Sequence, residues 1–218
     1  MRPGCGAGSG ESAAASSPTD NSDSGITTDN GSTTDTEVDS SGWARGGTAA
    51  ITTNFPPASP FTAALGSVCA LTASYTLGPC YFNPDDYRED ISDGQLGVPV
   101  ILALRLVDSQ CNPMAGADVD IWHCNAEGLY SGDSSDSSDA SSFNTGFCTD
   151  NDASALAGRW FRGIQTTDSD GIVYFKTCFP GWYPGRTTHI HFQIRYNNRQ
   201  SLVSQFCFDD TLSNDIYL

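Results

Sequence analysis

The 218-residue sequence has few basic residues and no long apolar run. Ten lysines and arginines stand against 26 aspartates and glutamates, which gives a formal net charge of −16. Nucleic acids and anionic membrane surfaces are bound through basic patches, so neither is expected as a partner. A membrane-spanning helix needs about 18 or more consecutive apolar residues, and no such run occurs, so we expect no membrane-spanning helix.

Apolar residues at helical spacing are also scarce. No long stretch repeats them every three to four residues, whereas short apolar or alternating segments lie between turns rich in Gly, Pro and Asp. This pattern predicts strands rather than helices. The expected strands cover residues 98–107, 117–122, 172–177, 188–194 and 202–208. Together they predict an all-β chain folded as a β-sandwich.

Aliphatic residues are nearly absent from residues 1–60, which are rich in Ser, Thr, Asp and Gly. Such a segment cannot bury enough apolar surface to offset the entropy lost on ordering, so we predict a disordered tail before a domain at 61–218. Cys5, followed by small residues and a polar linker, is similar to the acylated start of a bacterial lipoprotein, but no apolar segment precedes it. Lipidation of Cys5 would be the one means of membrane anchoring, and a plain secreted tail is the alternative.

None of the eight cysteines forms a C-x-x-C pair, and their spacing suits neither zinc nor an iron–sulfur cluster. Eight is many for a cytosolic chain, so we expect disulfides and an extracytoplasmic location, with buried free thiols as the alternative. Spacing does not fix the connectivity, but turn-rich loops make Cys69–Cys80 and Cys124–Cys148 the candidate bridges. Seven domain cysteines would leave one unpaired, and we expect that one to be buried.

Histidine is rare as well, and two of the three histidines stand together in the segment FPGWYPGRTTHIHFQI. The segment is interpreted as a turn followed by a strand, in which His189 and His191 point to one face. The opposite face carries Ile190, Phe192 and Ile194. Two imidazoles placed in this way can chelate a metal. A half-exposed strand without metal, or a zinc or cupin-type site, shows the same pattern, so the metal stays open.

Four segments of the chain resemble the intradiol ring-cleavage dioxygenases, the family of the catechol and protocatechuate dioxygenases. They are LGPCYF with YREDISDGQLGVPV, then GADVDIWHCNAEGLYSG, then FRGIQTTDSDG, and finally FPGWYPGRTTHIHF with SQFCF. Together they cover most of residues 70–208. The specific signal is the conjunction of a Tyr after the D-I-W-H strand with a later Tyr, Arg and H-x-H.

The resemblance implies a site and a reaction. The implied ligands of a non-haem Fe(III) are Tyr130, Tyr183, His189 and His191, and the implied active-site residues are Tyr183, Arg186 and Gln205. The implied substrates are a small aromatic catechol and O2, and the product is a cis,cis-muconate. No ligand role falls to His123, which we expect to be structural, and Trp122 and Trp182 are expected to be packing residues.

These residue types suit ferric iron. Phenolate oxygen is a hard anionic ligand for this hard, highly charged ion. Two phenolates and one hydroxide balance three positive charges, and two neutral imidazoles complete five positions. A catechol dianion can displace the hydroxide and one tyrosinate, which the family implies is Tyr183, and this group can then take the second catechol proton. Arg186 is suited to stabilise charge on the ring, with Gln205 orienting it.

The sequence departs from the family pattern at two places, and two other functions remain open for it. Only the five residues 184–188 separate Tyr183 from His189, fewer than in the cytosolic enzymes, so we expect a substrate other than simple catechol or protocatechuate. The chain ends soon after its last strand, so we expect either a truncation or a missing C-terminal wall of the pocket. The alternatives are a zinc or copper site that uses only the two histidines, and a non-catalytic, prealbumin-like binding sandwich.

Overall fold

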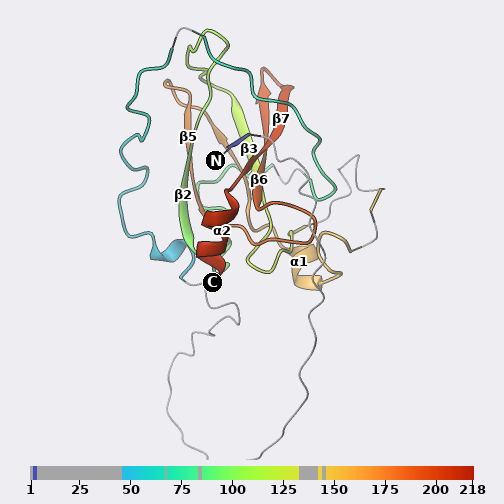
Figure 1. Cartoon of the computed structure of the whole chain (residues 1–218). Coiled ribbons are helices and arrows are strands. Elements are labelled where there is room, and N and C mark those ends of the chain that lie inside the picture. Colours follow the sequence, from blue (N-terminus) through green and yellow to red (C-terminus); the bar gives the residue numbers. More distant parts are fainter. Residues whose placement is uncertain (1, 4–45, 67, 83–84, 133–141, 144–145) are drawn as a thin grey trace, which may run out of the picture.

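The computed structural model describes residues 2–3, 46–66, 68–82, 85–132, 142–143 and 146–218, and its strands form two antiparallel sheets (Figure 1). The larger sheet has the order β1-β7-β6-β3-β4. Its strands are β1 (Arg2–Pro3), β3 (Asp118–Trp122), β4 (Arg162–Thr166), β6 (His189–Tyr196) and β7 (Arg199–Cys207). The smaller sheet pairs β2 (Pro99–Arg105) with β5 (Ile172–Cys178). The predicted β-sandwich is confirmed.

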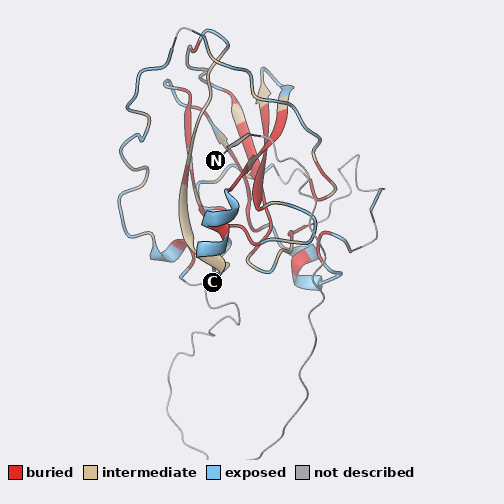
Figure 2. Ribbon diagram, viewed as in Figure 1, coloured by how far each residue is buried: buried red, intermediate tan, exposed pale blue. Residues whose placement is uncertain are grey.

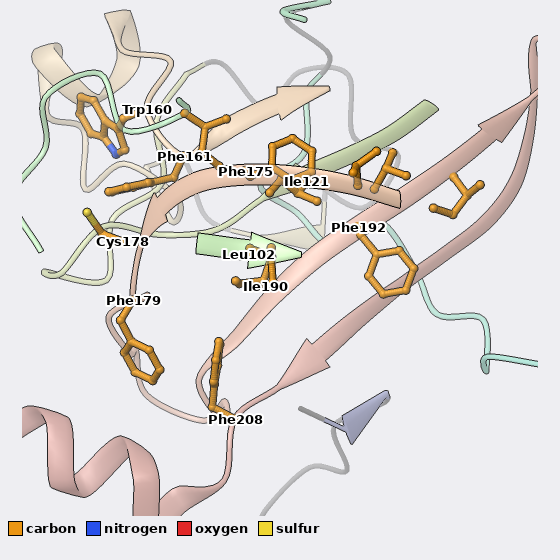
Figure 3. Close-up of a cluster of buried hydrophobic side chains, with 14 of the residues drawn as sticks. Leu102, Ile121, Trp160, Phe161, Phe175, Cys178, Phe179, Ile190, Phe192 and Phe208 are labelled. Atoms are coloured by element: carbon orange, nitrogen blue, oxygen red, sulfur yellow. The ribbon is translucent and has the colours of Figure 1, made fainter. Parts of the chain in front are cut away.

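The core lies between these sheets. The inner face of β6 contributes Ile190, Phe192 and Ile194, as its alternation predicted, and Leu102 and Phe175 face them from the smaller sheet (Figure 3). Ile190 and Phe175 are fully buried. Figure 2 shows the buried residues running along β3, β5 and β6, whereas much of helix α2 is exposed. One face of β6 is therefore fixed in the core, which sends His189 and His191 to the other face.

Three short helices were not predicted from the sequence. They are η1 (Thr48–Ala50), α1 (Ala153–Ala157) and α2 (Asp210–Tyr217). Aspartate side chains cap the last two, because Asp152 accepts from the Ala155 N–H and Asp209 from the Thr211 N–H. Helix α2 is bonded to the loop between β5 and β6, because the Tyr217 hydroxyl donates to the Pro180 carbonyl at 2.9 Å. None of the three is long enough for helical periodicity to stand out.

Residues 46–60, which composition assigned to the tail, contact the domain. The Gly47 N–H donates to the Gly97 carbonyl at 3.0 Å. The hydroxyls of Thr48 and Ser92 lie 2.7 Å apart. Phe55 packs edge-on against a strand residue of the smaller sheet, Tyr174. Contacts with the domain thus begin before residue 61, because they depend on single residues and not on the apolar runs that composition detects.

The disulfide pairs differ from the predicted ones. Cys69 is bonded to Cys111 and Cys80 to Cys148, with Cα separations of 5.3 and 5.5 Å, and Cys207 is also disulfide-bonded. The expectation of disulfides is confirmed, but both candidate pairs are wrong, because the true partners come from loops that meet only in the fold. Two domain cysteines are free and buried, Cys124 and Cys178, and not one. Cys5 lies outside the described residues.

Within the described part of the chain, no helix is long and apolar enough to cross a membrane.

Candidate metal centre

Strand β6 places both histidines in the middle of the larger sheet. His191 lies opposite Trp122 of β3 on one side and opposite Gln205 of β7 on the other. His189 lies opposite Cys207. The Nε2 atoms of the two imidazoles are 3.0 Å apart. The ladder therefore holds His191 from both sides of β6 and His189 from the β7 side.

Both imidazoles are held neutral with Nε2 facing the partner ring. The Nδ1 of His189 is 2.6 Å from the Thr187 carbonyl, which can only accept, so Nδ1 carries the proton and Nε2 keeps its lone pair. The His191 ring stacks on Trp122 with 3° between the planes. Burial lowers the pKa of His189 to about 4 and that of His191 well below its usual value. Neutral imidazoles of this kind are the form that binds metals.

Two packed loops supply the tyrosines. Tyr130 follows a tight turn in which the Asn125 side chain accepts from the Leu129 N–H, and its own N–H donates to the Cys148 carbonyl at 2.7 Å. The loop of Tyr183 docks on that turn, since the Gly181 N–H donates to the Asn125 carbonyl at 3.0 Å. At Gly128 a Cβ would lie 2.5 Å from the Trp182 carbonyl oxygen, so glycine is required for this approach.

Four donor atoms converge where these loops meet β6. The Tyr130 and Tyr183 hydroxyls are 3.4 Å apart, and the Tyr183 hydroxyl is 3.2 Å from Nε2 of His189, which in turn is 3.0 Å from Nε2 of His191. Atoms about 2.0–2.2 Å from one ion, at angles of roughly 90–120°, are about 2.8–3.8 Å from each other. The donor cluster, defined as these four side chains, therefore has the spacing of a metal-ligand set.

The donor cluster favours a highly charged cation. Burial, and then the neighbouring Tyr183, raise the pKa of Tyr130 well above its usual value, and burial also raises that of Tyr183. Both phenols thus keep their protons unless a strong cation replaces them. No group of three or more His, Cys, Asp and Glu side chains that could hold a metal occurs among the described residues. Beyond the two imidazoles, the donor atoms that lie near one another here are the two phenol oxygens.

Arg186 and Gln205 lie together beside the donor cluster. The Nη2 of Arg186 donates to Oε1 of Gln205 at 2.6 Å. Gln205 is buried and sits opposite His191 in the β6–β7 ladder, whereas Arg186 is exposed. The fold therefore brings all six residues named from the sequence to one place.

The structural or packing roles expected for three other aromatic residues are confirmed for two of them and wrong for the third. His123 is buried and both of its nitrogens are occupied, by Thr177 Oγ1 at 2.7 Å and the Cys124 carbonyl at 2.8 Å, which leaves none for a metal. Trp122 is buried as expected. Trp182 is 57 % exposed, so the packing role expected for it is wrong. It lies on the loop before β6 and lines an open pocket.

An open pocket of about 630 Å³ adjoins Tyr183. Its lining includes the aromatic residues Phe147 and Trp182 and the acidic residues Glu127 and Asp150. Sequence analysis did not single out this lining, although Glu127 and Trp182 are near neighbours of Tyr130 and Tyr183 along the chain. The pocket offers a path from solvent to the Tyr183 side of the donor cluster.

Comparison with known proteins agrees with the fold and the motifs. The family described as Dioxygenase matches residues 78–217. The structure of an intradiol ring-cleavage dioxygenase from Tetranychus urticae is similar, with a TM-score of 0.57, 34% identity and coverage of 68% of this chain and 69% of that one. The chain belongs to the intradiol ring-cleavage dioxygenase family.

Two curated relatives are more distant. A catechol 1,2-dioxygenase of Candida albicans is 25% identical over 62% of this chain and 46% of its own length. A chlorocatechol 1,2-dioxygenase of Pseudomonas putida is 26% identical over 44% of this chain and 36% of its own length. The chain thus spans less than half the length of the curated relatives it matches.

Proposed function

We propose that this chain is an intradiol dioxygenase that holds one non-haem Fe(III) and inserts both atoms of O2 into a catechol-type ring, giving a cis,cis-muconate in the breakdown of aromatic compounds. Its ligands would be the donor cluster, Tyr130, Tyr183, His189 and His191. The observation that carries the proposal is the convergence of these four donors at 3.0–3.4 Å from one to the next. Fe(III) would supply the charge that holds the substrate as a catecholate and activates it towards O2.

The chain's own residues divide the remaining tasks. Tyr183 lines the pocket, and its phenol oxygen would be the base that takes the second catechol proton. The Arg186 guanidinium lies where it can stabilise negative charge that develops on the ring, and its hydrogen bond to Gln205 orients it. Tyr130 and the two histidines are buried and would stay in place as ligands.

The alternatives fit the geometry less well. Any ion held by both histidines would also lie within reach of the Tyr183 hydroxyl, 3.2 Å from His189 Nε2, so a site without tyrosines would have to exclude a donor that is already present. A non-catalytic binding sandwich gives no reason for two buried neutral imidazoles to face one buried and one partly buried phenol. We further propose an extracytoplasmic location, because structural disulfides persist in oxidising compartments.

The test is the colour and turnover of purified protein from iron-replete expression. Tyrosinate-to-Fe(III) charge transfer should make it burgundy, with one iron per chain, and addition of a catechol should consume O2 and produce a muconate. Reconstitution of the chelated protein with Fe(III), but not with Zn(II), should restore both. A colourless, iron-free protein that leaves catechols intact would contradict the proposal.

The charge of the pocket leads to a prediction about substrates. The lining contains Glu127 and Asp150 and neither lysine nor arginine. We therefore expect kcat/KM to be lower for 3-(3,4-dihydroxyphenyl)propionate than for its neutral methyl ester, by about two- to fivefold for each exposed carboxylate. Glu127→Gln with Asp150→Asn should reduce the difference, and so should high salt. If the ratio of kcat/KM for the ester to that for the acid is the same in the parent and in the double variant, the ring substituent does not reach this pocket.

A further inference from the structure

Arg162, on β4, is a buried arginine without a carboxylate partner. It is 1 % exposed, and the two ion pairs with carboxylates in the described part of the chain belong to Arg88 and Arg195. Its guanidinium lies over the Phe82 ring, 4.4 Å from the centroid, and Nη1 is buried without a hydrogen-bond partner. Burial lowers the pKa of Arg162 to about 10, so the group stays charged at neutral pH. A buried, unpaired cation costs free energy, and its contacts should explain what it does.

The acceptors of Arg162 are two backbone carbonyls. Its Nε and Nη2 donate to the Ser131 carbonyl at 2.9 and 2.6 Å, and Nη2 also donates to the Cys80 carbonyl at 2.7 Å. Ser131 directly follows Tyr130 in the chain. One guanidinium therefore joins the backbone beside Tyr130 to the segment that carries Cys80.

A disulfide closes these contacts into a ring. Cys80 is bonded to Cys148, and the Cys148 carbonyl accepts the N–H of Tyr130 at 2.7 Å. The ring runs from Arg162 to Cys80, across the disulfide to Cys148, to Tyr130 and Ser131, and back to Arg162. Tyr130 is thus held from both sides of its own backbone. We call this ring the Tyr130 clamp.

We propose that the Tyr130 clamp, through Arg162 and the Cys80–Cys148 disulfide, positions the Tyr130 phenol in the donor cluster. Arg162 is a positioning residue, and the inference rests on the proposed function because it concerns one of the proposed ligands. The three residues after Tyr183 are exposed, whereas Ser131, which follows Tyr130, is fully buried.

The first test needs no metal. Amide hydrogen exchange of the full metal-free chain is compared for the parent, Arg162→Met, and the double variant Cys80→Ser/Cys148→Ser. Losing charge-assisted hydrogen bonds should speed exchange at Tyr130 and its neighbours by about tenfold or more. The matched control is Cys69→Ser/Cys111→Ser, which removes a disulfide outside the clamp and should leave exchange at Tyr130 unchanged. Equal acceleration in both disulfide variants would mean general loosening and would overturn the clamp.

The second test reads Tyr130 as a ligand. In a Tyr183→Phe background Tyr130 is the one phenol left in the donor cluster, so the tyrosinate-to-Fe(III) band reports on it alone. Arg162→Met should shift and broaden this band, Arg162→Lys should restore it in part because the charge returns without the fork, and the Cys69/Cys111 control should leave it unchanged.

The outcomes of the two tests are distinguishable. A parent protein that takes up no iron contradicts the proposed function, while the exchange data still decide the clamp. If Arg162→Met does not fold, Arg162→Lys and the Cys80/Cys148 variant decide instead. Parent-like exchange and a parent-like band in folded Arg162→Met would overturn the inference.

Discussion

Replacing His191 by alanine is expected to remove most of the iron while the sandwich still folds. His191 supplies a neutral donor 3.0 Å from His189 Nε2, and the one other histidine, His123, has both nitrogens hydrogen-bonded elsewhere in the fold. Mutating the outer partners of metal ligands already costs 10–100-fold in affinity, so losing a ligand should cost about 100-fold or more. The measurement is iron per chain after dialysis, together with the loss of the burgundy colour.

Two variants control for packing. His191→Phe keeps a ring against Trp122, on which His191 stacks, but supplies no donor, so it should lose iron to the same extent. His123→Asn changes the other buried histidine, which has both nitrogens hydrogen-bonded within the fold, and should retain iron. Full iron content in His191→Phe would show that His191 is not a ligand.

Replacing Arg186 by leucine is expected to keep the iron and the colour but to abolish most of the turnover. The hydrogen bond that Arg186 makes here goes to Gln205 and not to any of the four donors. Its removal should therefore leave the proposed ligand set intact. Losing one group that stabilises developing charge typically costs about 10²–10³ in kcat. Turnover per bound iron, measured with several catechols, is the decisive quantity.

Further variants separate catalysis from structure at this position. Gln205→Ala should give a smaller loss than Arg186→Leu, because the guanidinium remains but is no longer oriented. Arg199→Leu changes another exposed arginine, at the start of β7, and should turn over at the parent rate. If Arg186→Leu also cleaves catechols at the parent rate, Arg186 is structural and the proposed mechanism fails at that residue.

The strands were predictable where one face had to be apolar. Alternation in residues 188–194 placed Ile190 and Phe192 in the core and His191 opposite them, and the structure confirms this. Strand β4 was missed because Arg162–Thr166 contains only one aliphatic residue, Ile164, although its first two residues are fully buried or nearly so in the fold. Helix α2, with eight residues, carries too short a pattern to stand out.

The site was predictable only in part from the residues themselves. The period of a strand pairs His189 with His191, but nothing in the spacing places Tyr130 beside them, and only the family resemblance named it. The disulfide partners were not predictable, because Cys148 meets Cys80 through loop packing over a sequence separation of 68. Arg162 was also missed, since an arginine in a sequence is usually exposed and only the fold shows it buried.

The two halves of the donor cluster are built differently, since one strand carries both histidines and two loops carry the tyrosines. The histidines are neighbours on one strand and stay close even in an unfolded chain. The tyrosines join them only after the loop of Gly181 has docked on Asn125 and the N–H of Tyr130 has met Cys148. A chain that meets metal too early therefore offers two imidazoles, which suit copper or zinc, whereas the folded chain offers the phenols that favour a trivalent ion. Under the proposed function, the phenols that distinguish a ferric site from a zinc or copper site are therefore offered only by the folded chain.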